Sequence, residues 1–135
     1  MYKIVVIEDN YADFFIFNEY AKESFEALTL VHLESLSAFE NYVRQNTIQD
    51  VSIIFLDLNL PSHHGVSLIK EVMKLANSIP VIVLSGNSDV KLTTTSMALG
   101  IKDYLLKDQL NPILIHNTIT NTIEQNNSNK LTHTR

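Results

Sequence analysis

Five side chains of this sequence are of the types that phosphoryl transfer needs: Glu8, Asp9, Asp57, Ser85 and Lys107. Carboxylates that share one site repel one another by about 4 kcal/mol per pair at 4 Å and an effective dielectric constant of 20, so a cation must accompany them. Oxygen ligands from two or three acids suit Mg²⁺, which keeps several waters and leaves room for a phosphate. Together with the positive charge of Lys107, these residue types predict a magnesium-assisted phosphoryl site.

Each of these groups has a distinct role in such a reaction. Asp57 is the candidate nucleophile, because an ionised carboxylate can attack a reactive phosphoryl donor without a general base. Mg²⁺ and Lys107 neutralise the phosphoryl oxygens, and the Ser85 hydroxyl donates a hydrogen bond to them. The competing interpretation is that Glu8, Asp9 and Asp57 only cap loops or a helix. That interpretation suits any one acid alone and weakens for the whole set.

The elements that must position these residues form an α/β pattern. Apolar, β-branched runs alternate with helical stretches, which is typical of a parallel sheet covered by helices on both faces. The predicted strands are KIVVI (3–7), LTLVHL (28–33), VSIIFL (51–56), PVIVLS (80–85) and DYLLK (103–107). The site residues then stand at the carboxyl ends of four strands, and a doubly wound sheet forms its ligand crevice outside those ends.

Helices are expected between and after these strands. The first covers about residues 11–26, with an apolar stripe at Phe14, Phe17, Ala21 and Phe25. Others are expected at about 36–46, 65–76 and 89–99, the last ended by Gly100. The fifth begins with Asn111 as N-cap and Pro112 in the first turn, and it presents Ile115, Ile119 and Ile123 on one face. From Gln125 the sequence is polar and aperiodic, so we expect one domain over residues 1–124 and a frayed tail over 125–135.

Composition excludes several classes of protein. A chain of 135 residues with 45% hydrophobic and 19% charged residues is typical of one globular domain. Its net charge of −5 argues against a DNA-binding surface, and the absence of cysteine excludes disulfides and thiolate metal sites. No apolar run approaches the roughly 18 residues of a membrane span, and the N-terminus becomes acidic before a signal peptide could form. We therefore expect a cytoplasmic protein.

Four segments resemble the receiver domain of two-component response regulators, over about residues 3–124. They are VVIEDN, IIFLDLNLPSHHG, PVIVLSG and ALGIKDYLLKD. The resemblance implies a flavodoxin-like (βα)5 fold with strand order 2-1-3-4-5. It also implies that Asp57 is phosphorylated, that Glu8 and Asp9 form the acidic pair and that the backbone carbonyl of Asn59 is a further metal ligand. Tyr104 falls at the aromatic switch position, although a half-buried strand aromatic is the ordinary interpretation of such a residue.

The chain departs from this family pattern at two places. Asp108 replaces the proline that often follows the lysine, and His63 and His64 occupy the loop beside the phospho-acceptor segment. The lysine itself is present, so we expect the site to work. The histidines show no zinc-like spacing with acids or cysteines, and we assign them no catalytic role. The glycines form no nucleotide-binding motif.

The resemblance implies a stand-alone signalling switch rather than an enzyme, similar to the chemotaxis response regulators. It would accept a phosphoryl group from a sensor histidine kinase or a histidine phosphotransfer protein. With no output domain expected after residue 124, its surface of helix 89–99, strand 103–107 and the fifth helix would bind a downstream protein or a second copy of itself. Asn59 and Asn87 are expected to control water access and therefore the phosphoryl lifetime.

Two other functions stay open. A metal-dependent phosphatase with an aspartyl-phosphate intermediate would also place an aspartate at a strand end. Such enzymes carry D-x-D there, whereas Asp57-Leu58-Asn59 lacks the second acid that protonates a leaving group. The other alternative is a receiver-like module whose output does not depend on phosphate. The intact set of site residues argues against it.

Overall fold

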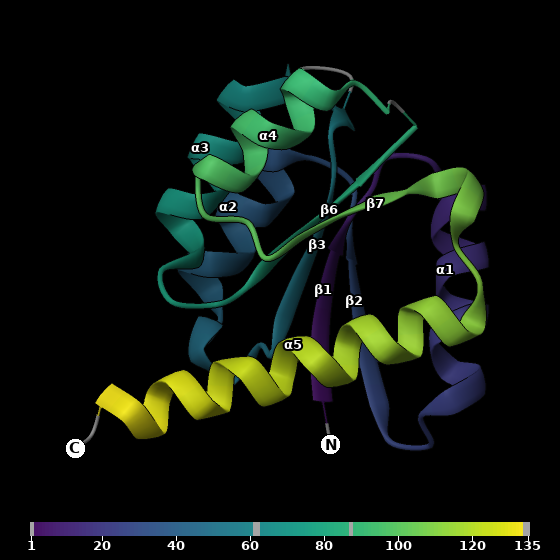
Figure 1. Cartoon of the computed structure of the whole chain (residues 1–135), viewed down its shortest axis with the longest axis vertical. Helices are drawn as coiled ribbons and strands as arrows, with labels where there is room; N and C mark the ends of the chain where they lie inside the picture. Colours follow the sequence, from purple (N-terminus) through teal and green to yellow (C-terminus); the bar gives the residue numbers. More distant parts are fainter. Residues whose placement is uncertain (1, 61–62, 87, 134–135) are drawn as a thin grey trace.

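The computed structural model describes residues 2–60, 63–86 and 88–133. Within them, a five-stranded parallel sheet has the order β2-β1-β3-β6-β7 (Figure 1). Counted along the chain, these strands have the order 2-1-3-4-5, which confirms the predicted doubly wound fold. The strands are β1 (Tyr2–Ile7), β2 (Leu28–Leu33), β3 (Ile53–Asp57), β6 (Val81–Ser85) and β7 (Asp103–Leu106).

Helices cover both faces of the sheet. Figure 1 shows α2, α3 and α4 on one side of the sheet and α1 and α5 on the other. Within the described ranges the helical bounds agree with the expected ones to within about two residues, except at the end of α5. The helices are α1 (Tyr11–Ser24), α2 (Leu36–Gln45), α3 (Gly65–Ala76), α4 (Val90–Ala98) and α5 (Pro112–His133).

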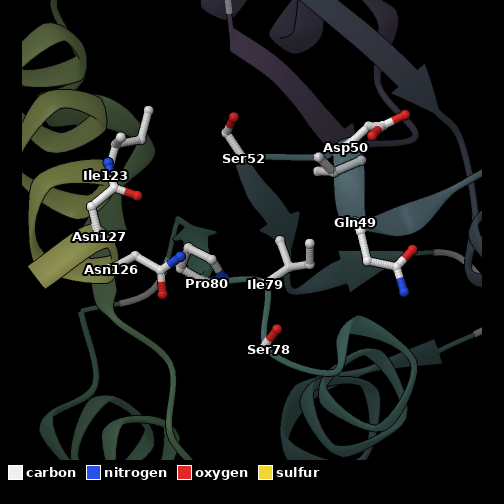
Figure 2. A pocket seen from close by; sticks show the side chains of 10 residues that line it. Gln49, Asp50, Ser52, Ser78, Ile79, Pro80, Ile123, Asn126 and Asn127 are labelled. Carbon is white, nitrogen blue, oxygen red and sulfur yellow. The ribbon is translucent and has the colours of Figure 1, made fainter. Parts of the chain in front are cut away.

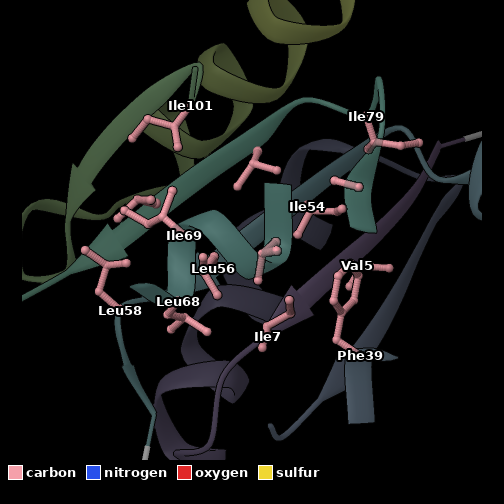
Figure 3. Packing of buried hydrophobic residues seen from close by; sticks show 14 of the residues in the cluster. Val5, Ile7, Phe39, Ile54, Leu56, Leu58, Leu68, Ile69, Ile79 and Ile101 are labelled. Carbon is pink, nitrogen blue, oxygen red and sulfur yellow. The ribbon is translucent and has the colours of Figure 1, made fainter. Parts of the chain in front are cut away.

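The apolar strands supply two cores, one on each face of the sheet. Successive side chains of a strand point to opposite faces, so Ile4 and Val6 pack in the core beneath α1 and α5. Val5 and Ile7 pack in the core beneath α2 and α3, of which Figure 3 shows part. Every residue of β3 and β6 is buried, which explains why their sequences are continuously apolar rather than alternating.

Local signals in the sequence fix several helix ends. The Asn111 side chain accepts a hydrogen bond from the Leu114 N–H at 2.8 Å, which confirms it as the N-cap of α5. Asn10 caps α1 in the same way by accepting from the Asp13 N–H at 3.0 Å. Gly100 follows α4 with a φ of +103°, in the left-handed region that glycine adopts at low cost.

The prediction of a frayed tail from Gln125 is wrong, because α5 continues as a helix to His133. The segment holds no glycine or proline, and extending a helix costs far less than nucleating one. Polar side chains are also compatible with the exposed positions of a helix end. Ile123, Asn126 and Asn127 line a cavity of about 160 Å³ together with the residues before β3 and β6, at the amino ends of those strands (Figure 2).

A short hairpin was not predicted. It consists of β4 (Asn59–Leu60) and β5 (His63–His64), paired antiparallel directly after β3. Two 3-10 turns, η1 (Ile48–Asp50) and η2 (Lys107–Gln109), precede β3 and α5. Among the described residues, no helix combines the length and the apolar character that a membrane span requires.

Candidate functional site

Strand register brings the predicted site residues to one edge of the sheet. Ile7 of β1 pairs with Leu56 of β3, so Glu8 and Asp57 follow neighbouring positions. Asp57 in turn pairs with Leu84 of β6, and the next residue of β6, Ser85, pairs with Leu106 of β7, directly before Lys107. The carboxyl ends of four adjacent strands therefore present these side chains together.

The acids form one cluster. Glu8, Asp9 and Asp57 each place a carboxylate oxygen within 4.8 Å of the others. Glu8 and Asp57 are each only 2% exposed, whereas Asp9 is exposed to solvent. Carboxylate oxygens from two buried acids and one accessible acid suit a hard cation that keeps some of its waters, so the donor set fits Mg²⁺.

Lys107 bridges three carboxylates. Its Nζ lies 2.9 Å from Oε1 of Glu8, 3.0 Å from Oδ2 of Asp13 and 3.3 Å from Oδ2 of Asp57. An ammonium group has three N–H donors, so one donor is available for each acid. The ammonium charge therefore offsets part of the repulsion within the cluster.

Burial and charge change the pKa values of both partners. Burial, together with a hydrogen bond to Asp57, raises the pKa of Glu8 to about 8, while the contact with Lys107 acts in the opposite direction. Burial of the Lys107 ammonium opposes its charge, but hydrogen bonds to Glu8 and Asp13 and the charge of Asp57 raise the pKa of Lys107 above its ordinary value. Without a cation, Glu8 therefore holds a proton near neutral pH and Lys107 stays charged.

The chain after Asp57 is anchored by its backbone. The Leu58 N–H donates to the carbonyl of Leu84 at 3.2 Å, and the Asn59 N–H donates to Oδ1 of Asp57 at 3.2 Å. Leu58 and Leu60 are buried, and the Asn59 side chain is exposed. These contacts hold the first residues of the loop close to the acidic cluster, which is where the resemblance implies a carbonyl ligand.

Ser85 and Tyr104 lie on the two strands beyond Asp57. Ser85 is buried at the end of β6. Tyr104 is half-buried on β7 and packs against the core beneath α2, α3 and α4. Tyr104 also lines a surface cavity of about 290 Å³ with Ser88, Thr93 and Gln109 among others. There is thus open space beside the aromatic ring between α4, β7 and the start of α5.

Two residues near the site were not predicted from the sequence. Asp13, in the first turn of α1, contacts Lys107 although the two are 94 residues apart in the chain. His32 of β2 donates from Nε2 to the backbone carbonyl of Glu8 at 2.6 Å, and its ring stacks on Phe14 with centroids 3.9 Å apart. The sequence offered one signal for Asp13. It is an acid in the first turn of the helix that follows the acidic pair Glu8 and Asp9.

The residues that depart from the family pattern lie in two short elements, η2 and β5. Asp108 is exposed in η2, and the described residues contain no cis peptide bond. His63 and His64 form β5, and the His64 side chain is exposed. Asn87 lies outside the described residues, so its expected effect on the phosphoryl lifetime stays a prediction.

Comparison with known proteins supplies the family. Residues 4–120 match the response regulator receiver domain. The transcriptional regulatory protein YclJ of Bacillus subtilis is 29% identical over 110 residues, which cover 78% of this chain and 44% of that protein. The cell cycle transcriptional regulator CtrA of Caulobacter vibrioides is 32% identical over 68 residues, covering 50% of this chain and 29% of that protein. The chain thus spans less than half the length of these curated relatives.

Solved structures agree with the fold. A CheY-like receiver domain protein from Methanospirillum hungatei JF-1 superposes with a TM-score of 0.81 at 16% identity, covering 96% of this chain and 98% of that one. A phosphorylated cyanobacterial phytochrome response regulator, RcpA, superposes with a TM-score of 0.69 at 25% identity, covering 91% and 89% of the two chains. The match over residues 4–120, on a sheet of this order, shows that the chain belongs to the family of response regulator receiver domains of two-component systems.

Proposed function

We propose that Asp57 accepts a phosphoryl group from a phosphohistidine of a sensor histidine kinase or a histidine phosphotransfer protein. The observation that carries this proposal is the position of Lys107 Nζ, 3.3 Å from Oδ2 of Asp57, at a cluster of acids that suits Mg²⁺. A carboxylate nucleophile, a cation site and a fixed ammonium group are the parts that phosphoryl transfer to an acid requires.

The transfer is a single displacement at phosphorus. An oxygen of Asp57 attacks the phosphorus atom, and the O–P bond forms while the P–N bond to the donor imidazole breaks. The electrons of the P–N bond return to the imidazole nitrogen. No residue needs to remove a proton from the nucleophile, because the attacking carboxylate is ionised.

The other site residues hold the phosphoryl group and the cation. Glu8, Asp9, Asp57 and the backbone carbonyl of Asn59 would hold Mg²⁺, which supplies charge neutralisation at the phosphoryl oxygens when it is bound. Lys107 neutralises a further oxygen, and the Ser85 hydroxyl donates a hydrogen bond to the phosphoryl group. The relative RcpA has been solved in a phosphorylated form, which supports this role for the fold.

The output of the domain is a change of its protein-binding face. Phosphorylation draws Ser85 and Lys107 towards the new oxygens, and Tyr104 turns into the space that Ser85 vacates. The surface cavity beside Tyr104 supports this proposal, because the ring has room on the α4 side of β7. The face of α4, β7 and α5 then favours one of two packings and binds a downstream protein, or a second copy of the chain as a homodimer.

We propose a signalling switch rather than an enzyme with external substrates. The phosphatase alternative requires a second acid two residues after the nucleophile, where this chain has the exposed Asn59. The only chemistry of the domain is then its own phosphorylation and dephosphorylation. With a net charge of −5 for the chain, DNA binding by this domain is not part of the proposal.

Labelling with a small phosphodonor tests the proposal. The protein is incubated with acetyl phosphate and Mg²⁺, and its intact mass is measured. We expect one added phosphoryl group in the wild type and none in Asp57→Asn. The variant Asp50→Asn, which changes an acid of η1 at the opposite end of the sheet, is the matched control and should be labelled normally. Full labelling of Asp57→Asn would contradict the proposal.

A further inference from the structure

We propose that Asp13 is a positioning residue that competes with the phosphoryl group for Lys107 and thereby slows phosphorylation of Asp57. This inference rests on the proposed function. Asp13 belongs to α1 and is not one of the acids of the possible metal site. Among the described residues, that site consists of Glu8, Asp9 and Asp57.

The contacts of Lys107 define the competition. The ammonium has three N–H donors and lies within ion-pair distance of three carboxylates, with Glu8 at 2.9 Å, Asp13 at 3.0 Å and Asp57 at 3.3 Å. A phosphoryl oxygen on Asp57 can gain a full hydrogen bond from Lys107 only if the ammonium moves towards it. The ammonium must then weaken one of its present contacts.

Exposure decides which contact is weakened. The side chain of Asp13 is 43% exposed, whereas Glu8 is 2% exposed. Breaking an ion pair with an exposed acid costs little, because water solvates the released carboxylate. Leaving the buried carboxyl group of Glu8 without its hydrogen-bond partner costs more whether or not the group is ionised, because water does not reach it to replace the contact. Asp13 is therefore the partner that Lys107 gives up.

The ion pair of Asp13 and Lys107 lies beside a small cavity. A cavity of about 60 Å³ lies where α1 approaches the start of η2, and its lining includes Asp13, Lys107, Ile16 and Leu110. Because this space adjoins both charged side chains, we expect the contact between them to open without a rearrangement of the core residues Phe17 and Leu84, which also line it. The pair can therefore separate while α1 and the sheet stay in place.

The negative charge of Asp13 should slow phosphorylation, as its direct contact with Lys107 does. A phosphoryl donor and the phosphorylated site both bring negative charge next to Lys107, and the carboxylate of Asp13 offsets the positive charge that would attract it. Removing the charge of Asp13 should leave more of the ammonium charge for the phosphoryl group. Because exposed ion pairs contribute only a small energy, we expect a rate increase of about two- to fivefold.

A purely structural role for Asp13 makes different predictions. An acid in the first turn of a helix interacts favourably with the helix dipole, so Asp13 could serve only to stabilise α1. In that case Asp13→Asn would lower the stability of the fold without raising the phosphorylation rate. The effect on the rate would also not depend on whether Lys107 is present.

The test is a double-mutant cycle on the phosphorylation rate. The rate with radioactive acetyl phosphate and Mg²⁺ is measured for wild type, Asp13→Asn, Lys107→Ala and the double variant. We expect Asp13→Asn to be about two- to fivefold faster than wild type, with the difference narrowing at high salt, and to have no effect in the Lys107→Ala background. Asp13→Glu, which keeps the charge, should resemble the wild type. Glu19→Gln removes an exposed acid elsewhere on α1 and should change nothing.

A second measurement needs no phosphoryl transfer. Fluoroberyllate takes the place of a phosphoryl group on an aspartate, and its affinity for the magnesium-loaded protein should be higher for Asp13→Asn by a similar factor. The inference would be overturned if Asp13→Asn were phosphorylated no faster than the wild type, or if it accelerated phosphorylation equally in the Lys107→Ala background. Either result would leave the labelling of Asp57 itself intact. A wild-type protein that takes no label at all would overturn the proposed function and this inference together.

Discussion

Nζ of Lys107 lies 2.9 Å from Oε1 of Glu8, an acid that is only 2% exposed. The pair joins the end of β1 to the segment directly after β7, two strands that are not neighbours in the sheet. Strands β3 and β6 lie between β1 and β7, and Asp57 is the last residue of β3. The contact between Glu8 and Lys107 therefore crosses the carboxyl end of the sheet beside Asp57. Any change of charge at Asp57 is therefore felt by groups attached to strands on both sides of it.

The raised pKa of Glu8 predicts a pH dependence of stability. The folded protein holds a proton on Glu8 up to a pKa of about 8, whereas the unfolded chain releases it near the ordinary value of 4.5. Between these values the folded state binds more protons, so the free energy of unfolding of the metal-free protein should fall as pH rises, by up to about 1.4 kcal/mol for each step of one in pH. Lys107 is charged in both states throughout this window, and its contribution is lost only at higher pH.

Urea unfolding between pH 5 and pH 8 in the presence of a chelator measures this effect. Glu8→Gln cannot ionise and should give a flatter pH profile than the wild type. Saturating Mg²⁺ should also flatten the wild-type profile, because the cation stabilises the ionised acid. If the free energy of unfolding fell with pH equally steeply in the wild type and in Glu8→Gln, another group would have to cause the pH dependence.

Mg²⁺ should bind weakly and depend on Asp9. The cluster offers few protein ligands, one of them exposed, so the ion keeps several waters. Because the loss of even an outer-shell partner lowers metal affinity about 10- to 100-fold, Asp9→Ala should weaken binding by at least about tenfold in calorimetry. Asp50→Ala, far from the cluster, is the control. If Asp9→Ala bound Mg²⁺ as the wild type does, the ion would have to sit elsewhere.

Gly100 should be intolerant of a side chain. Its φ of +103° is strained for any other residue, and a Cβ there would lie 3.3 Å from Cε of Met73. Gly100→Ala should therefore lower the free energy of unfolding by about 1–3 kcal/mol. Gly86→Ala is the control. A Cβ at Gly86 would meet no atom within 4 Å, and the φ of Gly86 lies outside the positive range that is strained for other residues. Chemical denaturation of both variants would show the difference, and equal stabilities would contradict the explanation.

Activation should move the output face. Backbone NMR of the magnesium-loaded protein with fluoroberyllate should show shifts in α4, at Tyr104 and at the start of α5, as well as around Asp57. Asp57→Asn, treated identically, should show none of them. Shifts confined to the surroundings of Asp57 would rule out this route of output and leave phosphate storage or relay.

The sequence predicts the sheet well because both faces are buried. Continuous β-branched runs such as residues 53–56 and 81–84 have few other stable conformations in a globular domain. Parallel strands also place their carboxyl ends together, so the approach of Glu8, Asp57 and Lys107 follows from topology. The end of α5 was missed because its polar residues carry no periodicity, although nothing in them stops a helix.

Other features could not be predicted because they depend on how elements pack. The ion pair of Asp13 and Lys107 joins positions 94 residues apart, and it exists only because α1 lies beside the start of η2. The pKa of Glu8 depends on burial that the sequence does not reveal. The hairpin of β4 and β5 has strands of two residues, too short for any alternation to be visible.

Chemical mapping of the phosphoryl group tests the central claim most directly. The protein is phosphorylated with acetyl phosphate and Mg²⁺, and borohydride then reduces the acyl phosphate, which converts the modified aspartate to homoserine. Peptide sequencing by mass spectrometry locates the converted residue. We predict homoserine at position 57 and unmodified acids at positions 8, 9 and 13. Conversion at any of those acids with Asp57 unchanged would contradict the assignment of Asp57 as the phospho-acceptor.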